Sequence, residues 1–234
     1  MTLFADRPAR ALAIYGHPDD PEVACGGTLA RWSAEGTEVR LVVVNAGDKG
    51  SFDATTDPQA LTDERAAEVA AAADVMGIVG VDMLGVPDGE AGNDLALRGR
   101  LVGLVRAVRP DVVVAPDPTA VFFGDSYVNH RDHREVGWAV LDAVAPAAAS
   151  PLYFPEQGPP HQVPTLLLSG TLAADAWVDV TATIEAKVAA VACHASRVGD
   201  DPELVASLLR ARTTEAGTKV GVAHAEAYRR LRLA

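Results

Sequence analysis

The stretch Ala-Leu-Ala-Ile-Tyr-Gly-His-Pro-Asp-Asp at residues 11–20 constrains the fold more than any other part of the chain. Its first five residues have the length and apolar composition of a strand buried on both faces, which is typical of parallel sheets. Gly16 then allows a sharp turn, and His17, Asp19 and Asp20 follow it directly. Functional residues of open α/β sheets lie just beyond the carboxyl ends of strands, where this cluster falls. The alternative is an ordinary strand-to-helix loop in which Asp20 caps the helix.

Buried strands and amphipathic helices alternate along the rest of the chain. We expect further strands at 39–44, 81–84, 112–115 and 166–168, and helices at 22–35, 62–76, 95–108, 130–144, 184–195, 202–209 and 222–231. This alternation predicts one α/β domain over residues 1–234, a Rossmann-like, mostly parallel sheet with helices on both faces. The proline-rich stretch 146–164 is predicted to be a surface loop and not a domain boundary.

Charge and composition argue against several classes of partner and cofactor. The net charge of −12, with no basic cluster except the short tail at residues 229–232, argues against nucleic acid and anionic membranes. The sequence has no apolar run long enough for membrane insertion, and its first ten residues lack the apolar core of a signal peptide, so we expect a cytoplasmic protein. No glycine fingerprint for a nicotinamide or flavin cofactor opens a helix. The sequence leaves open whether the chain forms a homo-oligomer.

A second polar cluster, Asn-His-Arg-Asp-His at residues 129–133, follows the fourth predicted strand. If it forms the first turn of a helix, the rings of His130 and His133 can point to the same side, although such pairs are also common on solvated helix faces. Because both clusters follow strands of one sheet, they can meet in one crevice. His17, Asp20 and one imidazole would then supply the three nitrogen and oxygen ligands of a catalytic zinc, with a position left open for water.

These motifs together resemble those of the PIG-L/LmbE-like deacetylases, zinc-dependent enzymes that remove acetyl groups from N-acetylglucosamine conjugates. The segments that carry the resemblance occur in the family's order: His-Pro-Asp-Asp at 17–20, Cys-Gly-Gly-Thr-Leu-Ala at 25–30, Asn-Ala-Gly-Asp-Lys-Gly at 45–50, Arg65-x-x-Glu68, Pro-Asp-Gly at 87–89 and His-x-x-His at 130–133. The likeness covers most of the chain, and the proline-rich stretch and the C-terminal helices match only loosely.

The resemblance implies that His17, Asp20 and His133 hold Zn²⁺ and that Asp19 is the general base. The chemistry is consistent with this, because amide hydrolysis near neutral pH needs an activated water, a base and an acid. The acid would be His130, which the resemblance makes responsible for stabilising the oxyanion and protonating the leaving amine.

Three further residues receive roles only from the resemblance. Asp132 would orient His130 or tune its pKa, and Arg65 and Asp88 would contact the hydroxyl groups of the sugar. Alternatively, Arg65 has only a structural role and forms an ion pair with Glu68, one helical turn away.

The chain departs from the family's pattern at two places. Pro21 stands where a glutamate is common, with Glu22 one residue later, so a catalytic glutamate is in doubt. Val128 stands where some relatives have a tyrosine, and its neighbour Tyr127 receives no role.

We therefore predict zinc-dependent hydrolysis of the N-acetyl amide of an N-acetylglucosamine-type conjugate. The alternatives are a zinc amidase that cleaves a larger acyl group from a sugar or thiol conjugate, and a metal-binding module without turnover. The remaining histidines, His161, His194 and His224, are predicted to be surface or core residues and not ligands.

Overall fold

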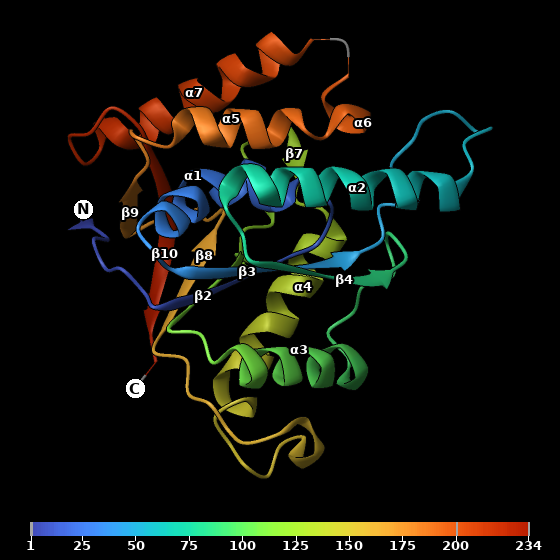
Figure 1. The fold of residues 1–234 in the computed structure, drawn as a ribbon, viewed down its shortest axis with the longest axis vertical. Helices are drawn as coiled ribbons and strands as arrows, with labels where there is room; N and C mark the ends of the chain where they lie inside the picture. The colour runs from blue at the N-terminus through green and yellow to red at the C-terminus, as the bar shows by residue number, and fades with distance from the viewer. Residues whose placement is uncertain (1, 200, 234) are drawn as a thin grey trace.

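A computed structural model describes residues 2–199 and 201–233. Its centre is a sheet with the strand order β1-β9-β10-β8-β5-β2-β3-β4 (Figure 1). The strands of this sheet are β1 (Thr2–Leu3), β2 (Arg10–Tyr15), β3 (Glu38–Asn45), β4 (Gly80–Val86), β5 (Val112–Pro116), β8 (Thr165–Ser169), β9 (Ala176–Asp179) and β10 (Ala225–Arg232). All of them run in the same direction except β10, which is antiparallel to β8 and β9. The predicted mostly parallel sheet is confirmed.

Helices cover both faces of the sheet, as predicted (Figure 1). The helical elements are α1 (Asp20–Ala34), α2 (Pro58–Met76), α3 (Leu95–Val108), α4 (Arg131–Asp142), α5 (Ile184–Ala192), α6 (Ala195–Val198), α7 (Pro202–Thr218), the π-turn η1 (Ala143–Ala147) and the 3-10 turn η2 (Pro155–Gln157). α1, α2 and α5 enclose one apolar core, and α3, α4 and η1 enclose the other. Burial from both sides explains why β2, β5 and β8 are uninterrupted apolar runs.

The order of the strands reverses at β2, and this reversal positions the site. β2 pairs in parallel with β3 on one side and with β5 on the other. The chain therefore leaves the carboxyl ends of β2 and β5 in different directions, which opens a crevice between their loops. The loops after these two strands carry the two polar clusters of the sequence.

The helix predicted at 222–231 is wrong, because this segment forms β10. Its residues, Ala-Glu-Ala-Tyr-Arg-Arg-Leu-Arg, favour helix in isolation, but pairing with β8 and β9 overrides that preference. Tyr228 is fully buried, and the basic tail is part of this strand and not an exposed helix end: Arg230 pairs with Asp6 and lies over the ring of Phe4. The short strands β1 and β9 have no counterpart among the predicted strands. α5 ends at Ala192, earlier than predicted, and α7 continues to Thr218.

The proline-rich stretch 146–164 runs over the surface, as predicted, and Arg106 of α3 holds it in place. The guanidinium of Arg106 is buried and donates hydrogen bonds to six carbonyl oxygens, those of Ala147, Ala148, Ser150, Tyr153, Phe154 and Gly158. A single planar group with five N–H donors can satisfy many carbonyls of an irregular segment.

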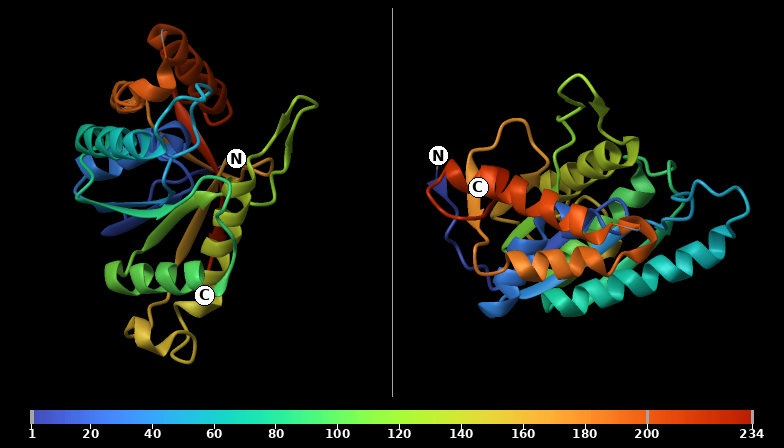
Figure 2. Two further views of the ribbon diagram at one scale, coloured as in Figure 1. Left: turned by 90° about the vertical axis from the view of Figure 1, so that its right-hand side faces the viewer. Right: turned by 90° about the horizontal axis from the view of Figure 1, so that it is seen from above.

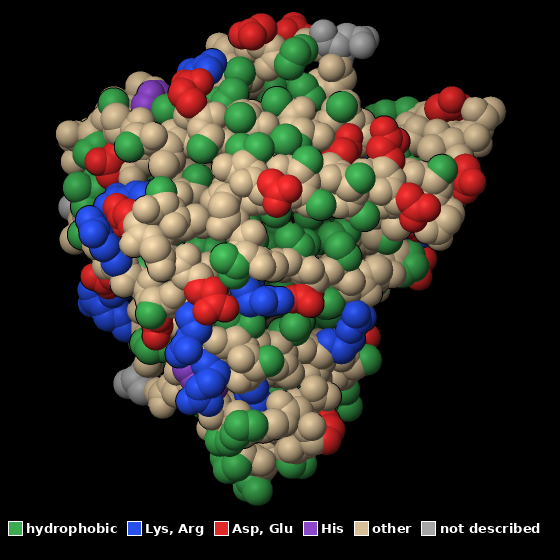
Figure 3. Space-filling view, viewed as in Figure 1, with side chains coloured by type: hydrophobic (Ala, Val, Ile, Leu, Met, Phe, Trp, Pro, Cys, Tyr) green, Lys and Arg blue, Asp and Glu red, His purple; other side chains and the backbone are tan. Residues whose placement is uncertain are grey.

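A small hairpin lies outside the central sheet, and charged side chains are distributed unevenly over the surface. β6 (Phe122–Phe123) and β7 (Tyr127–Val128) pair in an antiparallel hairpin that projects from the body of the protein (Figure 2). Acidic side chains are spread over α2 and the loop before it, whereas basic side chains gather near the C-terminus (Figure 3). Within the described residues, no helix is both long and apolar enough to span a membrane.

Candidate metal and catalytic site

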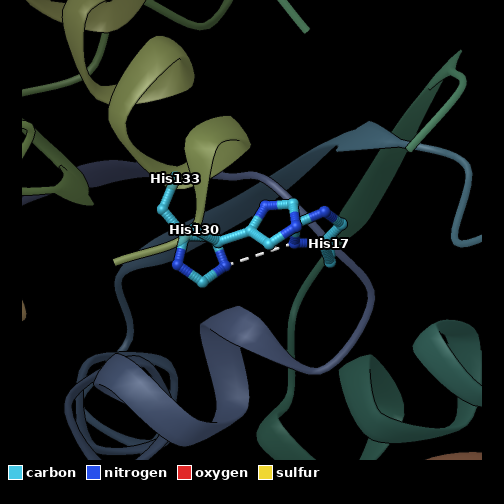
Figure 4. A group of neighbouring side chains, drawn as sticks. All are labelled: His17, His130 and His133. Atoms are coloured by element: carbon cyan, nitrogen blue, oxygen red, sulfur yellow. Dashed lines mark hydrogen bonds between the residues drawn. The ribbon is translucent and has the colours of Figure 1, made fainter. Parts of the chain in front are cut away.

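Side chains from the loops after β2 and β5 meet at the carboxyl edge of the sheet. His17 lies between β2 and α1, and Asp20 is the first residue of α1. His130 caps the N-terminus of α4, and His133 lies in its first turn. The rings of all three histidines point toward one another (Figure 4), each with one nitrogen within 4.8 Å of the others. The convergence expected from the sequence is therefore observed.

His17, His133 and Asp20 have the spacing of metal ligands. Nδ1 of His17 lies 3.2 Å from Nε2 of His133, and Asp20 places Oδ1 3.1 Å from His133 Nε2 and Oδ2 3.4 Å from His17 Nδ1. Ligand atoms bound tetrahedrally to zinc at its usual bond lengths are about 3.3–3.5 Å apart. Two imidazole nitrogens and a carboxylate oxygen at this spacing fit a divalent ion such as Zn²⁺.

In His17 and His133, the ring nitrogen that faces away from the other ligands lies close to a side-chain oxygen. Nε2 of His17 is 3.1 Å from Oδ2 of Asp132, and Nδ1 of His133 is 3.0 Å from Oδ1 of Asn129. Asn129 is itself held by donating to the carbonyl of Ala120 at 2.8 Å. When a carboxylate or amide oxygen accepts the proton of the outward nitrogen, the inward nitrogen can offer its lone pair to a metal, which is the usual arrangement of metal-binding histidines.

Asp132 therefore orients His17, and its predicted action on His130 is not what the geometry favours. Its Oδ2 is 3.8 Å from Nδ1 of His130, farther than from His17. The carboxylate is fully buried and also accepts hydrogen bonds from the amide of Gly89 at 2.6 Å and the side chain of Asn45 at 3.2 Å. Asp132 thus ties together the loop after β2, the end of β3, the loop after β4 and α4.

His130 is the most exposed member of the histidine cluster, and its Nδ1 is already used. This nitrogen accepts a hydrogen bond from the backbone N–H of Asp132 at 3.2 Å. A ring that accepts at Nδ1 carries its proton at Nε2. Burial and the neighbouring charge of His17 lower the pKa of His130, which also favours the neutral ring.

The electrostatics of the site favour a cation between the rings. Burial opposes the charged form of His17, but the hydrogen bond and charge of Asp20, together with Asp88 and Asp132, raise its pKa to about 9. Burial alone would raise the pKa of Asp20, yet His133 and His17 outweigh it and hold the carboxyl pKa well below its usual range. Without a metal, the site holds a proton in the place of the ion.

Asp19, the predicted base, occupies a left-handed backbone conformation with φ of 92°. Such a conformation is uncommon for a residue with a side chain and is found most often at functional sites. Burial, and then the charge of Asp20, raise the pKa of Asp19 to about 6, although the guanidinium of Arg197 acts in the opposite direction. Nε of Arg197 donates to Oδ2 of Asp19 at 3.2 Å, a contact between residues far apart in the sequence.

The two residues assigned to the sugar lie beside the loop at 47–50. Arg65 is buried beneath this loop and donates to the carbonyl of Gly50 at 3.2 Å. A Cβ at Gly47 would lie 2.6 Å from Cδ of Arg65, so glycine is needed there. Asp88 accepts hydrogen bonds from the amides of Gly47 at 2.9 Å and Lys49 at 3.2 Å. Both residues support the loop, and their contact with a sugar stays a prediction.

Arg65 does not pair with Glu68, the structural alternative considered for it. Glu68 instead accepts hydrogen bonds from the amide and the hydroxyl of Ser196, both at 2.7 Å.

Glu22 faces His194: its Oε2 lies 3.4 Å from Nε2 of that ring, and both side chains are fully buried. His194 is therefore a core residue, as predicted.

Other buried polar residues near the site gave no signal in the sequence. Glu226 of β10 and Lys187 of α5 form a buried ion pair, and Glu226 also accepts from the amides of Gly27 and Thr28 in α1. These partners come from segments that are distant in the sequence, and β10 was predicted as a helix, so no local pattern could have joined them.

Comparisons with known proteins point to one family. A family model described as PIG-L, GlcNAc-PI de-N-acetylase, matches residues 12–144. The diacetylchitobiose deacetylase of Thermococcus kodakarensis is 27% identical over 224 residues, which are 94% of this chain and 82% of that protein. The 1D-myo-inositol 2-acetamido-2-deoxy-alpha-D-glucopyranoside deacetylase 2 of Saccharopolyspora erythraea is 33% identical over 177 residues, 65% of this chain and 62% of that protein.

Solved structures give the same result. The N,N'-diacetylchitobiose deacetylase of Pyrococcus horikoshii, in complex with an inhibitor, matches with a TM-score of 0.87 and 28% identity. The match covers 96% of this chain and 84% of that structure.

The position of Asp132 predicts that it supports metal binding. Asp132→Asn should weaken the affinity for Zn²⁺ by about 10–100-fold, the usual effect of losing the oxygen partner of a ligating histidine. Asp142→Asn, at the other end of α4, is the matched control and should bind Zn²⁺ normally. Competition with a chromogenic chelator measures both. Unchanged affinity in Asp132→Asn would contradict the assignment to His17.

The pKa of His17 predicts that metal binding releases a proton. At pH 7 the ring is charged in the metal-free protein, because its pKa of about 9 lies above that pH. The ion must displace this proton, so its affinity should rise roughly tenfold per pH unit up to about pH 9. Calorimetric titrations in buffers of different ionisation enthalpy should give about one proton released per ion. Binding without proton release would contradict the assignment of His17 as a ligand.

Proposed function

Since this chain belongs to the PIG-L family, described as GlcNAc-PI de-N-acetylases, we propose that it hydrolyses the N-acetyl amide of an N-acetylglucosamine-type sugar conjugate. Acetate and the free amine are the products. The observation that carries this proposal is the spacing of 3.1–3.4 Å among His17, His133 and Asp20. The relatives named above, which are deacetylases of acetylated amino sugars, support the same reaction.

The metal proposed for this site is zinc. A bound zinc ion acts as a Lewis acid and lowers the pKa of a water molecule to about 7. His17, His133 and Asp20 would hold it, with Asp132 and Asn129 fixing the two rings from behind. The donor set of two nitrogens and one oxygen is that of a catalytic zinc site.

Asp19 is the proposed general base. It directly precedes a ligand, and burial raises the pKa of its carboxyl group to about 6, close to the pH at which it has to exchange protons. Its carboxylate takes a proton from the attacking water as the new C–O bond forms. The same group then returns that proton to the amine nitrogen as the C–N bond breaks.

His130 is the proposed donor to the oxyanion. Its Nδ1 accepts from the amide of Asp132, so Nε2–H is the group available to the amide oxygen of the substrate. The predicted role of His130 in protonating the leaving amine is less compatible with this geometry, because it requires a second ring proton, and a proton on Nδ1 would break the hydrogen bond from Asp132. We therefore assign return of the proton to Asp19.

Several features stay predictions of the sequence alone. These are the cytoplasmic location, the lack of a nucleic-acid partner, the extent of the domain as a single unit and any homo-oligomer.

The assignment of Asp19 predicts a separation of turnover from metal binding. Asp19→Asn should retain Zn²⁺ and lower kcat by about 10²–10⁴-fold, the usual contribution of a general base. His133→Ala should lose both metal and activity. Free amine released from N-acetylglucosamine conjugates, measured beside the zinc content, checks both variants. Near-normal kcat in Asp19→Asn would show that the base is another residue.

A further inference from the structure

Arg197 connects the candidate site to the single helical turn α6, which the proposed mechanism does not otherwise use. α6 lies beside α2 (Figure 1). Nε of Arg197 donates to Oδ2 of Asp19 at 3.2 Å. Among residues 2–199 and 201–233, no other group donates a hydrogen bond to the carboxylate of Asp19. Within this part of the chain, the orientation of the proposed base therefore depends on one contact.

The carboxylate of Asp19 is not held by its own helix. Asp19 occupies the position before α1 at which an aspartate usually accepts a hydrogen bond from a backbone N–H of the first turn. Its side chain makes no such bond, and its backbone is left-handed, with φ of 92° and ψ of −28°. The carboxylate is therefore left for a donor from another segment, and that donor is Arg197.

Two buried glutamates hold α6 in place. Glu68 of α2 accepts hydrogen bonds from the amide and the hydroxyl of Ser196, both at 2.7 Å. His194 directly precedes α6, and its Nε2 lies 3.4 Å from Oε2 of the fully buried Glu22 in α1. A helix of four residues is too short to be stable by itself, so these contacts determine where α6 lies. They thereby fix the position from which Arg197 reaches the site.

The side chain of Arg197 is suited to orienting a carboxylate. It is 45% exposed, so it fills no part of the apolar core. A guanidinium stays charged and carries its N–H donors in a fixed plane. With Oδ2 of Asp19 occupied, Oδ1 is the oxygen that accepts no hydrogen bond from the described residues. A general base needs an oxygen within hydrogen-bond reach of the proton that it takes.

We propose that Arg197 is a positioning residue, which holds Oδ2 of Asp19 so that Oδ1 takes the proton of the attacking water. The inference rests on the proposed function, because Asp19 acts as a base only in that reaction. The hydrogen bond acts on the base and not on the substrate or the metal ligands. Its loss should therefore lower kcat and leave KM and zinc binding nearly unchanged. An exposed ion pair without this role would change neither kcat nor KM.

The first test compares Arg197→Ala with the unchanged zinc-loaded protein in the release of free amine from an N-acetylglucosamine conjugate. We expect kcat to fall about 10–100-fold, because misplacing a reacting group by about 1 Å can cost as much as 10²-fold. KM and zinc content should stay within about twofold of the unchanged protein. Arg210→Ala is the matched control, because Arg210 is 39% exposed and forms a similar ion pair with Glu185, on helices without candidate site residues.

A double variant shows whether Arg197 acts through Asp19. In the Asp19→Asn protein, where the base is already removed, adding Arg197→Ala should lower kcat by less than about twofold. A residue that contacts the substrate directly, or that only supports the fold, would lower kcat by the same factor in both backgrounds. Unchanged kcat in Arg197→Ala, a rise in KM in place of the fall in kcat, or the full further loss in the Asp19→Asn protein would each overturn the proposal.

Crystal structures separate failure of the positioning role from failure of the proposed function. If the unchanged protein releases amine from no conjugate, the proposed hydrolysis is wrong, and the zinc-loaded structures of the unchanged protein and of Arg197→Ala decide the positioning role. The carboxylate of Asp19 should contact Arg197 in the first structure and take a different orientation in the second. The same orientation in both structures would overturn the proposal.

Discussion

The parallel pairing of β2 with β5 is the constraint on which the site depends. Three consecutive pairs, Ala11 with Val112, Leu12 with Val113 and Ala13 with Val114, fix the register of these strands. All six residues are buried, so slipping the register would expose apolar surface or bury the polar loops. The pairing places the loops after β2 and β5 side by side at the reversal of the strand order. His17, Asp19 and Asp20, at the junction of β2 and α1, thereby face His130 and His133 at the start of α4.

The elements that the sequence predicted well are those decided by local pattern. The strand at residues 11–15 is a continuous apolar run that is buried throughout, and the helix at 95–108 has an apolar periodicity that matches its burial. The polar clusters follow strands of the same sheet. The prediction for β10 was wrong for the opposite reason. Its residues prefer helix, and the segment becomes a strand because it pairs with β8 and β9. No local sequence pattern reveals this pairing.

Prediction of the candidate site from the sequence had the same limit, because contacts between distant segments could not be predicted. The ligand-type residues could be named from their spacing, but the partners of their rings could not. The resemblance assigns Asp132 to His130, its neighbour in the sequence, and the backbone N–H of Asp132 does contact that ring, but its carboxylate lies closer to His17 from the opposite loop. The contact between Arg197 and Asp19 joins residues that are 178 positions apart. Hydrogen bonds of this kind depend on how distant segments pack, so they follow from the fold and not from any motif.

The central claim is that His17, Asp20 and His133, and not the three histidines, form the metal site. A crystal structure of the zinc-loaded protein, with anomalous data collected on both sides of the zinc absorption edge, tests it most directly. The account predicts one anomalous peak per chain, at about 2.0–2.2 Å from Nδ1 of His17, Nε2 of His133 and a carboxylate oxygen of Asp20. A peak bound by His130 in place of Asp20, or no peak between these residues, would contradict it.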